Sequence, residues 1–471
     1  MTPTHTTADV NGLFPLPLVP FERYMIADDG PQYPMEVLLR LQVEGNFHRE
    51  LLDHALTLVL PRHPLLQARL EGRSRTLRWV ACPRSESSVR WATGEPLEEA
   101  EWRRPLDLAR EPGLRVTVWE TQGATVLLLK VHHACCDAIG AVQLASELLA
   151  AYADLTRSET HLPSLPELTP FILRHRAYVA PPEGPLPQTT LVERLWGAVR
   201  EAWKVFARFP VPIATPAKPL TADLANAALG YPELLVRRLS QADTDHLRQV
   251  ARKRNVSVND LLLCDLFLAL HAWNKKSGRH KGHQWFRVTM PTNLRSGELG
   301  VPTVCRIGYA FLTRRSRDCE DADALLASLV EETRLIKRWR LGSYFLAVID
   351  FLTRLPGALR LVLRSSRCFS TVILSNVGDP EWHFTGKFEC AGNEVRFGPL
   401  ILKEVVAVPP IRAGTRIGLL VSYLRDGLSI GMRCDSRHIS ASDAERFLDL
   451  FVQSITHTAD QAVEPVAVDK A

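Results

Sequence analysis

The sequence predicts an α/β protein of two lobes, each built from strands mixed with helices. Three observations lead to this fold class. The chain has 471 residues, more than one hydrophobic core usually organises, so two units of roughly 150–250 residues each are expected. Strand-like and helix-like apolar patterns occur together in both halves of the chain. A proline-rich stretch lies between the halves and is typical of a connection.

The first half contains three predicted strands and two predicted helices. Apolar residues alternate with other residues at 35–43 and 114–119, which indicates strands. Residues 124–131 (ATVLLLKV) form one apolar run, as in a strand buried on both faces of a sheet. Apolar residues recur at helical spacing at 51–60 and 137–155, which indicates helices.

The stretch 160–235 contains many prolines and predicts a crossover between the lobes. We therefore expect an N-terminal lobe at 1–180, the crossover at 181–232 and a C-terminal lobe at 233–471. Within the crossover, 191–209 predicts an amphipathic helix that also carries basic residues. This pattern is compatible with a helix packed on the body or lining a tunnel, and with peripheral membrane contact.

The second half shows the same mixture of strands and helices. Strands are predicted at 234–239, 285–290, 371–374, 417–423 and 428–434. Helices are predicted at 240–253, 261–273 and 442–455, and a basic, helix-rich stretch covers 322–366.

Composition and charge limit the classes of function. Hydrophobic residues make up 46% and charged residues 23% of the chain, which is the balance of a soluble globular enzyme. The net charge of +5 is too small to argue for nucleic acid, and it suits an anionic partner such as coenzyme A, a phosphopantetheine carrier or an acidic membrane surface. The nine cysteines form no CxxC pair, so neither a disulfide framework nor a zinc site is predicted. Because no signal peptide or membrane-spanning run is evident, we expect a cytoplasmic protein.

The residues with the clearest chemistry follow the predicted strand at 124–131. The sequence there is His132-His133-Ala-Cys-Cys-Asp137-Ala-Ile-Gly140, with the glycine at the start of the next helix. The pKa of histidine lies near neutrality, so an imidazole at a strand end against the interior is suited to act as a general base. Asp137 is expected to hold the turn by accepting hydrogen bonds.

Three other interpretations of this segment are open. The paired histidines are compatible with hydrogen-bonded core residues. A metal site would need further ligands at suitable spacing, and none stands nearby in the sequence. Cys135 and Cys136 are compatible with a nucleophile, although free cysteines are commonly inert buried residues.

The segment resembles the HHxxxDG motif of the condensation-domain and coenzyme A-dependent acyltransferase superfamily. Its members include nonribosomal peptide synthetase condensation domains, polyketide-associated acyltransferases, wax ester synthase/diacylglycerol acyltransferases, alcohol acetyltransferases and chloramphenicol acetyltransferase. Further segments resemble blocks of the superfamily in the same order, namely RHPLLQARL at 62–70, EPGLRV at 111–116, VSVND at 256–260, PTNLR at 291–295 and LSNVG at 374–378.

This resemblance implies a chloramphenicol acetyltransferase-like fold with an active-site tunnel between the lobes. It implies that His133, the second histidine, is the catalytic base. It also implies that Asp137 is structural and pairs with an arginine of the second lobe, for which Arg295 in the matching block is the candidate. His132 and Gly140 are expected to support the site.

The sequence departs from the superfamily pattern in three places. Ala138 replaces the motif glycine, and its methyl group would narrow the site if it faced the tunnel, or strain the turn if the position needed a positive φ. The block at 375–380 lacks the first proline of the SNVPGP block of wax ester synthases, and the DFGWG block of plant alcohol acyltransferases is missing. Ser375 and Asn376 are still expected to bind substrate, and Asn376 to help stabilise the oxyanion.

The function that follows is acyl transfer from a thioester, either acyl-CoA or an acyl carrier protein, to a small-molecule hydroxyl or amine. The resemblance implies no cofactor, metal or acyl-enzyme, because the acyl-CoA or phosphopantetheine-bound acyl group is a co-substrate. One alternative is a wax ester or diacylglycerol synthase at a lipid surface, which the basic segments 191–209 and 334–340 favour. The other is a non-catalytic binding module, which Ala138 and the missing DFGWG block favour.

Overall fold

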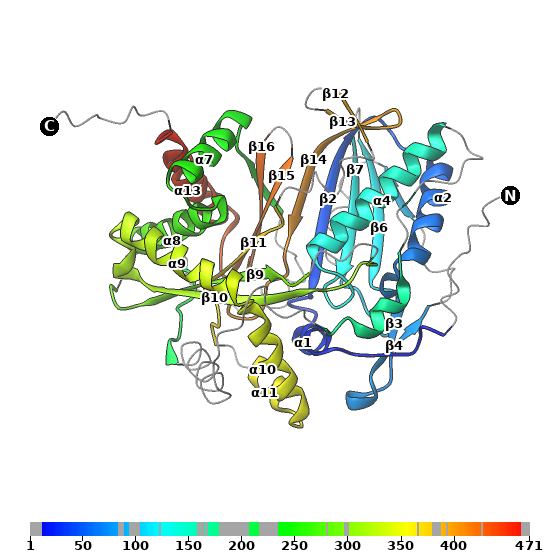
Figure 1. Cartoon of the computed structure of the whole chain (residues 1–471), viewed down its shortest axis with the longest axis horizontal. Helices are drawn as coiled ribbons and strands as arrows, with labels where there is room; N and C mark the ends of the chain where they lie inside the picture. The colour runs from blue at the N-terminus through cyan, green and yellow to red at the C-terminus, as the bar shows by residue number, and fades with distance from the viewer. Residues whose placement is uncertain are drawn as a thin grey trace.

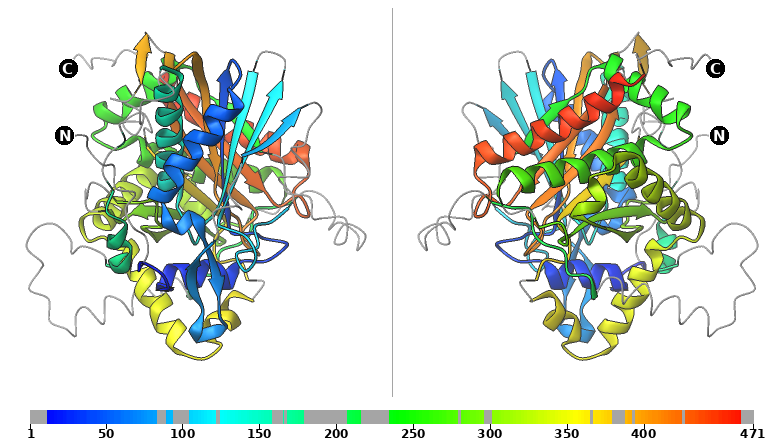
Figure 2. Two further views of the ribbon diagram at one scale, coloured as in Figure 1. Left: turned by 90° about the vertical axis from the view of Figure 1, so that its right-hand side faces the viewer. Right: turned by 90° about the vertical axis from the view of Figure 1, so that its left-hand side faces the viewer.

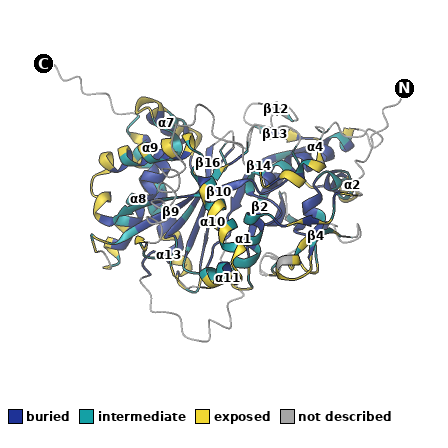
Figure 3. Cartoon of the chain, turned by 60° about the horizontal axis from the view of Figure 1, so that its bottom comes forward, coloured by how far each residue is buried: buried dark blue, intermediate teal, exposed yellow. Residues whose placement is uncertain are grey.

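Two β-sheets with helices packed against them form the body of the molecule (Figure 1). The computed structural model describes residues 12–82, 89–93, 104–121, 124–157, 165, 168–178, 207–215, 234–278, 281–295, 301–364, 367–378, 388–391, 394–424 and 427–462. Each half of the molecule has its own cluster of buried apolar side chains, as the dark blue interior of both halves shows (Figure 3).

The first sheet has seven strands in the order β12-β13-β14-β2-β7-β6-β5. In chain order the strands are β2 (Glu36–Glu44), β5 (Val89–Thr93), β6 (Leu114–Thr121), β7 (Ala124–His132), β12 (Glu389–Ala391), β13 (Glu394–Phe397) and β14 (Leu400–Val408). β2 and β7 pair antiparallel in unbroken register, with Glu36 opposite His132 and Glu44 opposite Ala124. The predicted strand at 124–131 is therefore a central strand with neighbours on both edges, and all but its first residue are buried.

Helices α2 (Arg49–Val59) and α4 (Ala138–Arg157) pack against this sheet and against each other. α4 is long and apolar enough to span a membrane by length and composition, and α7 and α8 pass the same test only as a pair bent by 104°. In α4, 78% of the apolar window is buried inside the protein, as in the core helix of a globular domain. A small sheet of β1 (Leu16–Pro17), β4 (Arg78–Ala81) and β3 (Ala68–Glu71) completes this half, with α1 (Pro20–Asp28) beside it.

The second sheet has six strands in the order β10-β9-β11-β15-β16-β8. In chain order they are β8 (Leu235–Arg238), β9 (Trp285–Asn293), β10 (Ile307–Arg315), β11 (Val372–Asn376), β15 (Ile417–Leu424) and β16 (Gly427–Cys434). Its helices are α7 (Gln241–Lys253), α8 (Val258–Lys276), α9 (Ala322–Arg338) and α13 (Ala441–Asp460), and Figure 2 shows α13 and α7 on the outer side of this half. Three of these helices begin at a serine whose hydroxyl accepts the third backbone N–H of the helix, at Ser240, Ser257 and Ser440.

Helices α10 (Gly342–Arg354) and α11 (Ala358–Leu363) stand apart from the layers that cover the sheets. They project at the lower edge of the molecule (Figure 1). α10 packs against β10 and α1, and α11 packs against α1, so both helices belong to the second half by sequence but lie along the junction of the halves.

The two halves are not consecutive in the sequence. β12, β13 and β14 follow β11 in the chain but complete the first sheet. The two sheets approach closely where β14 passes β16, because a Cβ at Gly431 would lie 2.4 Å from the carbonyl oxygen of Ala407. Arg412 also pairs with Asp28 of α1 at 2.8 Å and ties the second half to the first.

The predicted α/β class with two lobes is confirmed, and every predicted strand and helix within the described residues coincides with an observed one. The strands β1, β4, β5, β10 and β12–β14 and the helix α1 were not predicted. The lobe boundaries at 180 and 232 stay predictions, because they fall at or next to the residues outside the described part of the chain. The same is true of the amphipathic helix predicted at 191–209, of which only 207–209 are described.

Candidate functional site

The end of β7 places His133 at the junction of the two halves. The backbone N–H of His133 donates to the carbonyl of Met35 at 2.7 Å, which continues the pairing of β7 with the start of β2. The side chain is only 5% exposed. The ring of Phe21, from α1, lies edge-on to the imidazole with 5.7 Å between ring centroids. On the other side, Cys305 of the second half places its Sγ 3.6 Å from His133 Nδ1.

This environment keeps the imidazole of His133 neutral. Burial lowers the pKa of His133 below its ordinary value, and the nearby Asp137 carboxylate only partly opposes this effect. Burial also raises the pKa of the Cys305 thiol well above its usual range, so His133 Nδ1 faces a neutral group. In the tautomer whose Nδ1–H points toward Cys305 Sγ, Nε2 carries the lone pair that can accept a proton from a substrate.

The pH dependence of activity follows from this pKa. Any activity that uses His133 as a base is expected to be constant through neutral pH and to fall only as the pH drops through the pKa of folded His133, below 6.5, because a protonated imidazole cannot accept a proton. The contribution of His133 to the stability of the folded protein also decreases in acid. The unfolded chain protonates this histidine first as the pH falls, so the contribution is complete above about 6.5 and is lost below it. A pH profile of kcat/KM measures this loss of activity in acid. A loss that already begins above about pH 7 would contradict the assignment.

Asp137 does not contact the ring of His133 in the described hydrogen bonds, and instead closes the turn that follows it. Its Oδ1 accepts from the backbone N–H of Gly140 at 2.9 Å, and its Oδ2 accepts from the N–H of Arg306 at 2.9 Å. Arg295 donates from both terminal nitrogens, at 2.9 and 2.8 Å, in a bidentate pair. Burial alone would raise the pKa of Asp137, but the Arg295 charge and these hydrogen bonds hold it below the ordinary value. The structure thus brings together the aspartate and the arginine that the sequence paired.

Gly140 and Ala138 have steric roles at this turn. A Cβ at Gly140 would lie 2.6 Å from Cys136 Sγ, so the glycine permits the close approach of the helix start to the cysteine. Ala138 is the first residue of α4, and it is not among the non-glycine residues with positive φ. The replacement of the motif glycine by alanine therefore does not strain the turn.

A loop of the second half lies across the first half at this point. Arg295 follows β9, and residues 301–306 lead back into β10. The carbonyl of Val301 accepts from Gln143 of α4 at 3.1 Å, and the N–H of Thr303 donates to His63 Nδ1 at 3.1 Å. Together with Cys305 and Arg306, these contacts fix the position of the loop against His133.

His63 itself is held by a buried ionic group that the sequence did not predict as part of the site. Its Nε2 lies 3.2 Å from Glu147 of α4, and Arg62 donates to the same carboxylate at 2.8 Å. Burial would raise the pKa of Glu147, but His63 and Arg62 lower it to about 2. Two features of the sequence could have indicated this group, namely the RHP segment at 62–64 and a glutamate within the largely apolar helix predicted at 137–155.

His132 supports the strand end. Its side chain is buried, its Nδ1 accepts from the N–H of Ala134 at 3.1 Å, and its Nε2 lies 3.7 Å from Asp29. Every described partner of His132 is in the first half. His132 is thus the core residue of the pair, and His133 is the residue that faces the second half.

Ser375 and Asn376 lie at the end of β11, in the second sheet. Asn376 donates to Asn259 at 3.3 Å, and its Oδ1 accepts from the N–H of Gly378 at 2.9 Å. Ser375 is 9% exposed. The described hydrogen bonds bring neither residue to His133, so their substrate-binding roles stay predictions.

The adjacent cysteines have the properties of core residues. Cys135 and Cys136 are fully buried, and burial raises the pKa of both thiols well above the ordinary value. A thiol with a raised pKa is a poor nucleophile. Within the described residues, no group of three His, Cys, Asp or Glu side chains is arranged to hold a metal ion.

Aromatic rings lead away from His133 to the surface helices. Phe21 contacts Tyr309 of β10 at 5.7 Å, and Tyr309 contacts Phe345 of α10 at 5.0 Å between centroids. Tyr24 of α1 contacts Phe345 as well, at 5.2 Å. The inner face of α10 is therefore connected to the candidate base by a continuous set of ring contacts.

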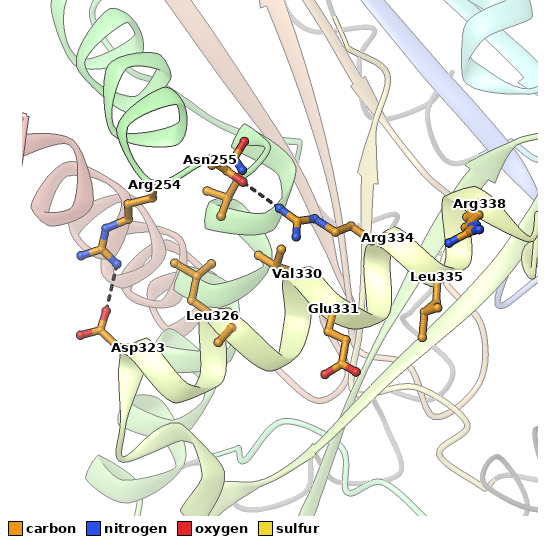
Figure 4. A pocket seen from close by; sticks show the side chains of 11 residues that line it. Arg254, Asn255, Asp323, Leu326, Val330, Glu331, Arg334, Leu335 and Arg338 are labelled. Atoms are coloured by element: carbon orange, nitrogen blue, oxygen red, sulfur yellow. Dashed lines mark hydrogen bonds and ion pairs between the residues drawn. The ribbon is translucent and has the colours of Figure 1, made fainter.

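A separate open pocket of about 710 Å³ lies between α9 and residues 254–256, which connect α7 to α8 (Figure 4). Asn255 and Val330 line it, and Arg334 donates to the carbonyl of Asn255 at 2.9 Å. Asp323 pairs there with Arg254. None of the predicted site residues lines this pocket.

The fold and this junction define a two-lobed protein of the chloramphenicol acetyltransferase-like class. The model of the condensation domain matches residues 25–280, more than half of the chain, and the chain belongs to the condensation-domain family. The resemblance seen in the sequence is thereby confirmed.

Similar proteins agree with this class. An uncharacterized protein of Mycobacterium tuberculosis (strain H37Rv), Rv2305, is 25% identical over 440 residues, which cover 88% of this chain and 95% of the relative. The trichothecene 15-O-acetyltransferase of Fusarium sporotrichioides has the same fold, with a TM-score of 0.69 at 10% identity, covering 94% of each chain. So does the starter condensation domain of rhizomide synthetase in complex with C8-CoA and Leu-SNAC, with a TM-score of 0.65 at 14% identity, covering 97% of each chain.

Proposed function

We propose that this protein transfers an acyl group from a thioester, carried by coenzyme A or an acyl carrier protein, to a hydroxyl or amine acceptor. The observation that carries the proposal is the state of His133. It is a buried imidazole at the junction of the halves whose pKa burial lowers, with Nδ1 3.6 Å from Cys305 Sγ, and the tautomer that we propose leaves the lone pair of Nε2 for substrate. A neutral imidazole is the form that can accept the proton of an attacking hydroxyl or amine.

The reaction needs one proton to move twice. His133 Nε2 takes the proton of the acceptor while the acceptor oxygen or nitrogen forms a bond to the thioester carbonyl carbon. The tetrahedral oxyanion then collapses, the carbon–sulfur bond breaks, and the leaving thiolate takes the proton from the imidazolium. No bond to the protein forms in this sequence, which agrees with the raised pKa of the Cys135 and Cys136 thiols.

The names of the similar structures support this class of substrates. One is an acetyltransferase, and another is a complex with C8-CoA and Leu-SNAC. Two observations favour catalysis over the binding-module alternative. Ala138 opens α4 without positive φ, and Asp137 accepts hydrogen bonds from Arg295 and from the N–H of Arg306. Both observations support a catalytic role for the junction of the two halves.

The test is release of free thiol from acetyl-, hexanoyl- and palmitoyl-CoA, and from the same acyl groups on a carrier protein, with a pool of alcohols and amines. We expect release that depends on the acceptor, with no burst when the acceptor is omitted, because no acyl-enzyme forms. An acceptor-independent burst equal to the enzyme concentration would contradict the direct mechanism. Carrier binding without release from any donor would favour the binding module.

A further inference from the structure

α10 exposes an apolar face to solvent although its opposite face is already packed. Its exposed large apolar side chains, at spacings of four, three and four residues, are Tyr344, Val348, Phe351 and Leu355, where the helix ends. Phe351 is 61% and Leu355 is 45% exposed. These spacings place the side chains on one side of the helix, as a single stripe. Leu361 of α11, which is 77% exposed, lies beyond the turn that follows.

The other side of both helices is buried against the protein. Ile349 and Leu359 belong to the core of the first half, and Phe345, Leu352 and Leu363 pack against that core. α10 is thus apolar on both sides, which for a surface helix indicates a second apolar environment outside the protein. The inner side is the one that reaches His133 through the aromatic rings.

Basic residues follow the stripe along the chain. Asp350 pairs with Arg354 one turn away, so these two charges offset each other. Arg360 of α11 and Arg364, directly after α11, are exposed, and residues 351–364 contain no acidic residue. The excess of positive charge therefore lies at the end of the stripe, next in sequence to Leu361.

We propose that the stripe of α10, with Leu361 of α11, is a docking surface for an anionic phospholipid membrane. Phe and Leu side chains that insert at the level of the headgroups, flanked by arginines that meet lipid phosphates, are the chemistry of interfacial helices. The two helices project from the edge of the molecule (Figure 1), and Figure 3 shows exposed residues along both of them. A projecting apolar ridge fits a deformable lipid surface, whereas a protein partner would have to offer a matching groove. The surface would bring apolar substrates to the side of α10 that leads to His133.

The test is flotation of the full-length protein with vesicles, which reads binding and does not depend on turnover. Vesicles of equal parts phosphatidylcholine and phosphatidylglycerol are compared with vesicles of phosphatidylcholine alone. We expect binding to the mixed vesicles, weaker by about fivefold or more without the anionic lipid. The variant F351S/L355S should bind the mixed vesicles at least about tenfold more weakly, because two inserting side chains are lost.

Leu335→Ser is the matched control. Leu335 has nearly the same exposure as Leu355, 44% against 45%, but lies on α9 in the open pocket. Binding of the Leu335→Ser variant to the mixed vesicles should stay within about twofold of wild type. Because both substitutions are at exposed positions, folding is preserved, and thermal melting checks this. Equal binding by wild type and F351S/L355S, or no binding by either, overturns the proposal. In one such outcome neither wild type nor F351S/L355S binds vesicles, while the variant loses a dimer or its binding to an acidic acyl carrier protein. That result would assign the surface to the second copy or to the carrier protein instead.

Discussion

Replacement of His133 by alanine is expected to lower the rate of acceptor-dependent thiol release by a factor on the order of 10² to 10⁴, the usual contribution of a positioned general base. The loss should appear in kcat, because the proton moves only as the acceptor attacks. KM for the donor should change little, since in the proposed mechanism the imidazole takes a proton from the acceptor and forms no bond to the acyl carrier. Steady-state rates with a free-thiol reagent measure the effect.

His133→Gln and His457→Ala separate catalysis from folding. Glutamine keeps a polar side chain of similar reach beside Cys305 but has no basic nitrogen, so its rate should match that of His133→Ala. His457 is exposed in the last turn of α13, and its replacement should leave the rate within about twofold. If His133→Ala retains wild-type turnover with the same acceptor requirement, His133 is not the base.

The fold could be predicted where one local pattern was sufficient. β7 is apolar along almost its whole length because both of its edges and faces are covered, and α7, α8 and α13 each begin at a serine cap. β12, β13 and β14 escaped prediction for a different reason. They join a sheet whose other strands lie far earlier in the chain, and nothing in their own sequence records that partner.

The site could be predicted only in part. His133 and Asp137 are close in the sequence, so one segment shows both. Arg295 was found because its block resembles one in a known family, not from spacing. Cys305 carries no local signal, and the RHP segment marks His63 without showing its contact with the loop, since both positions relative to His133 depend on how the loop at 301–306 lies on the first half. Contacts made by a crossing loop are a property of the tertiary structure alone.

The pair of Asp137 and Arg295 is expected to be the largest single contribution to the junction of the halves. Asp137→Asn should lower the free energy of unfolding by about 3 kcal/mol, because an amide cannot accept from all four donors and leaves Arg295 without its counter-charge. Thiol release should fall as well, since the turn that Asp137 closes carries His133. Denaturant unfolding followed by tryptophan fluorescence measures the change in stability.

Arg295→Met tests the same pair from the other side. Asp137 would keep the two backbone N–H donors of Gly140 and Arg306 but lose the bidentate guanidinium, so a loss of similar size is expected. The double variant Asp137→Asn/Arg295→Met should lose less than the sum of the single losses, because neither charge is left alone. Additive losses would show that the two side chains do not interact.

Arg254→Ala is the control for a salt bridge without burial. Arg254 pairs with Asp323 at 2.9 Å, but both side chains are exposed, so its removal should cost less than about 1 kcal/mol.

The pH dependence of the stability of Asp137→Asn distinguishes loss of a buried ion pair from a general loss of packing. Because the pKa of Asp137 lies below its ordinary value of 3.8, its stabilising contribution is complete above that pH and is lost as the pH falls through the folded pKa. The stability difference between wild type and Asp137→Asn should therefore be constant through neutral pH and shrink in acid. A difference that is unchanged in acid would place the effect of the substitution in packing rather than in the charge of the carboxylate.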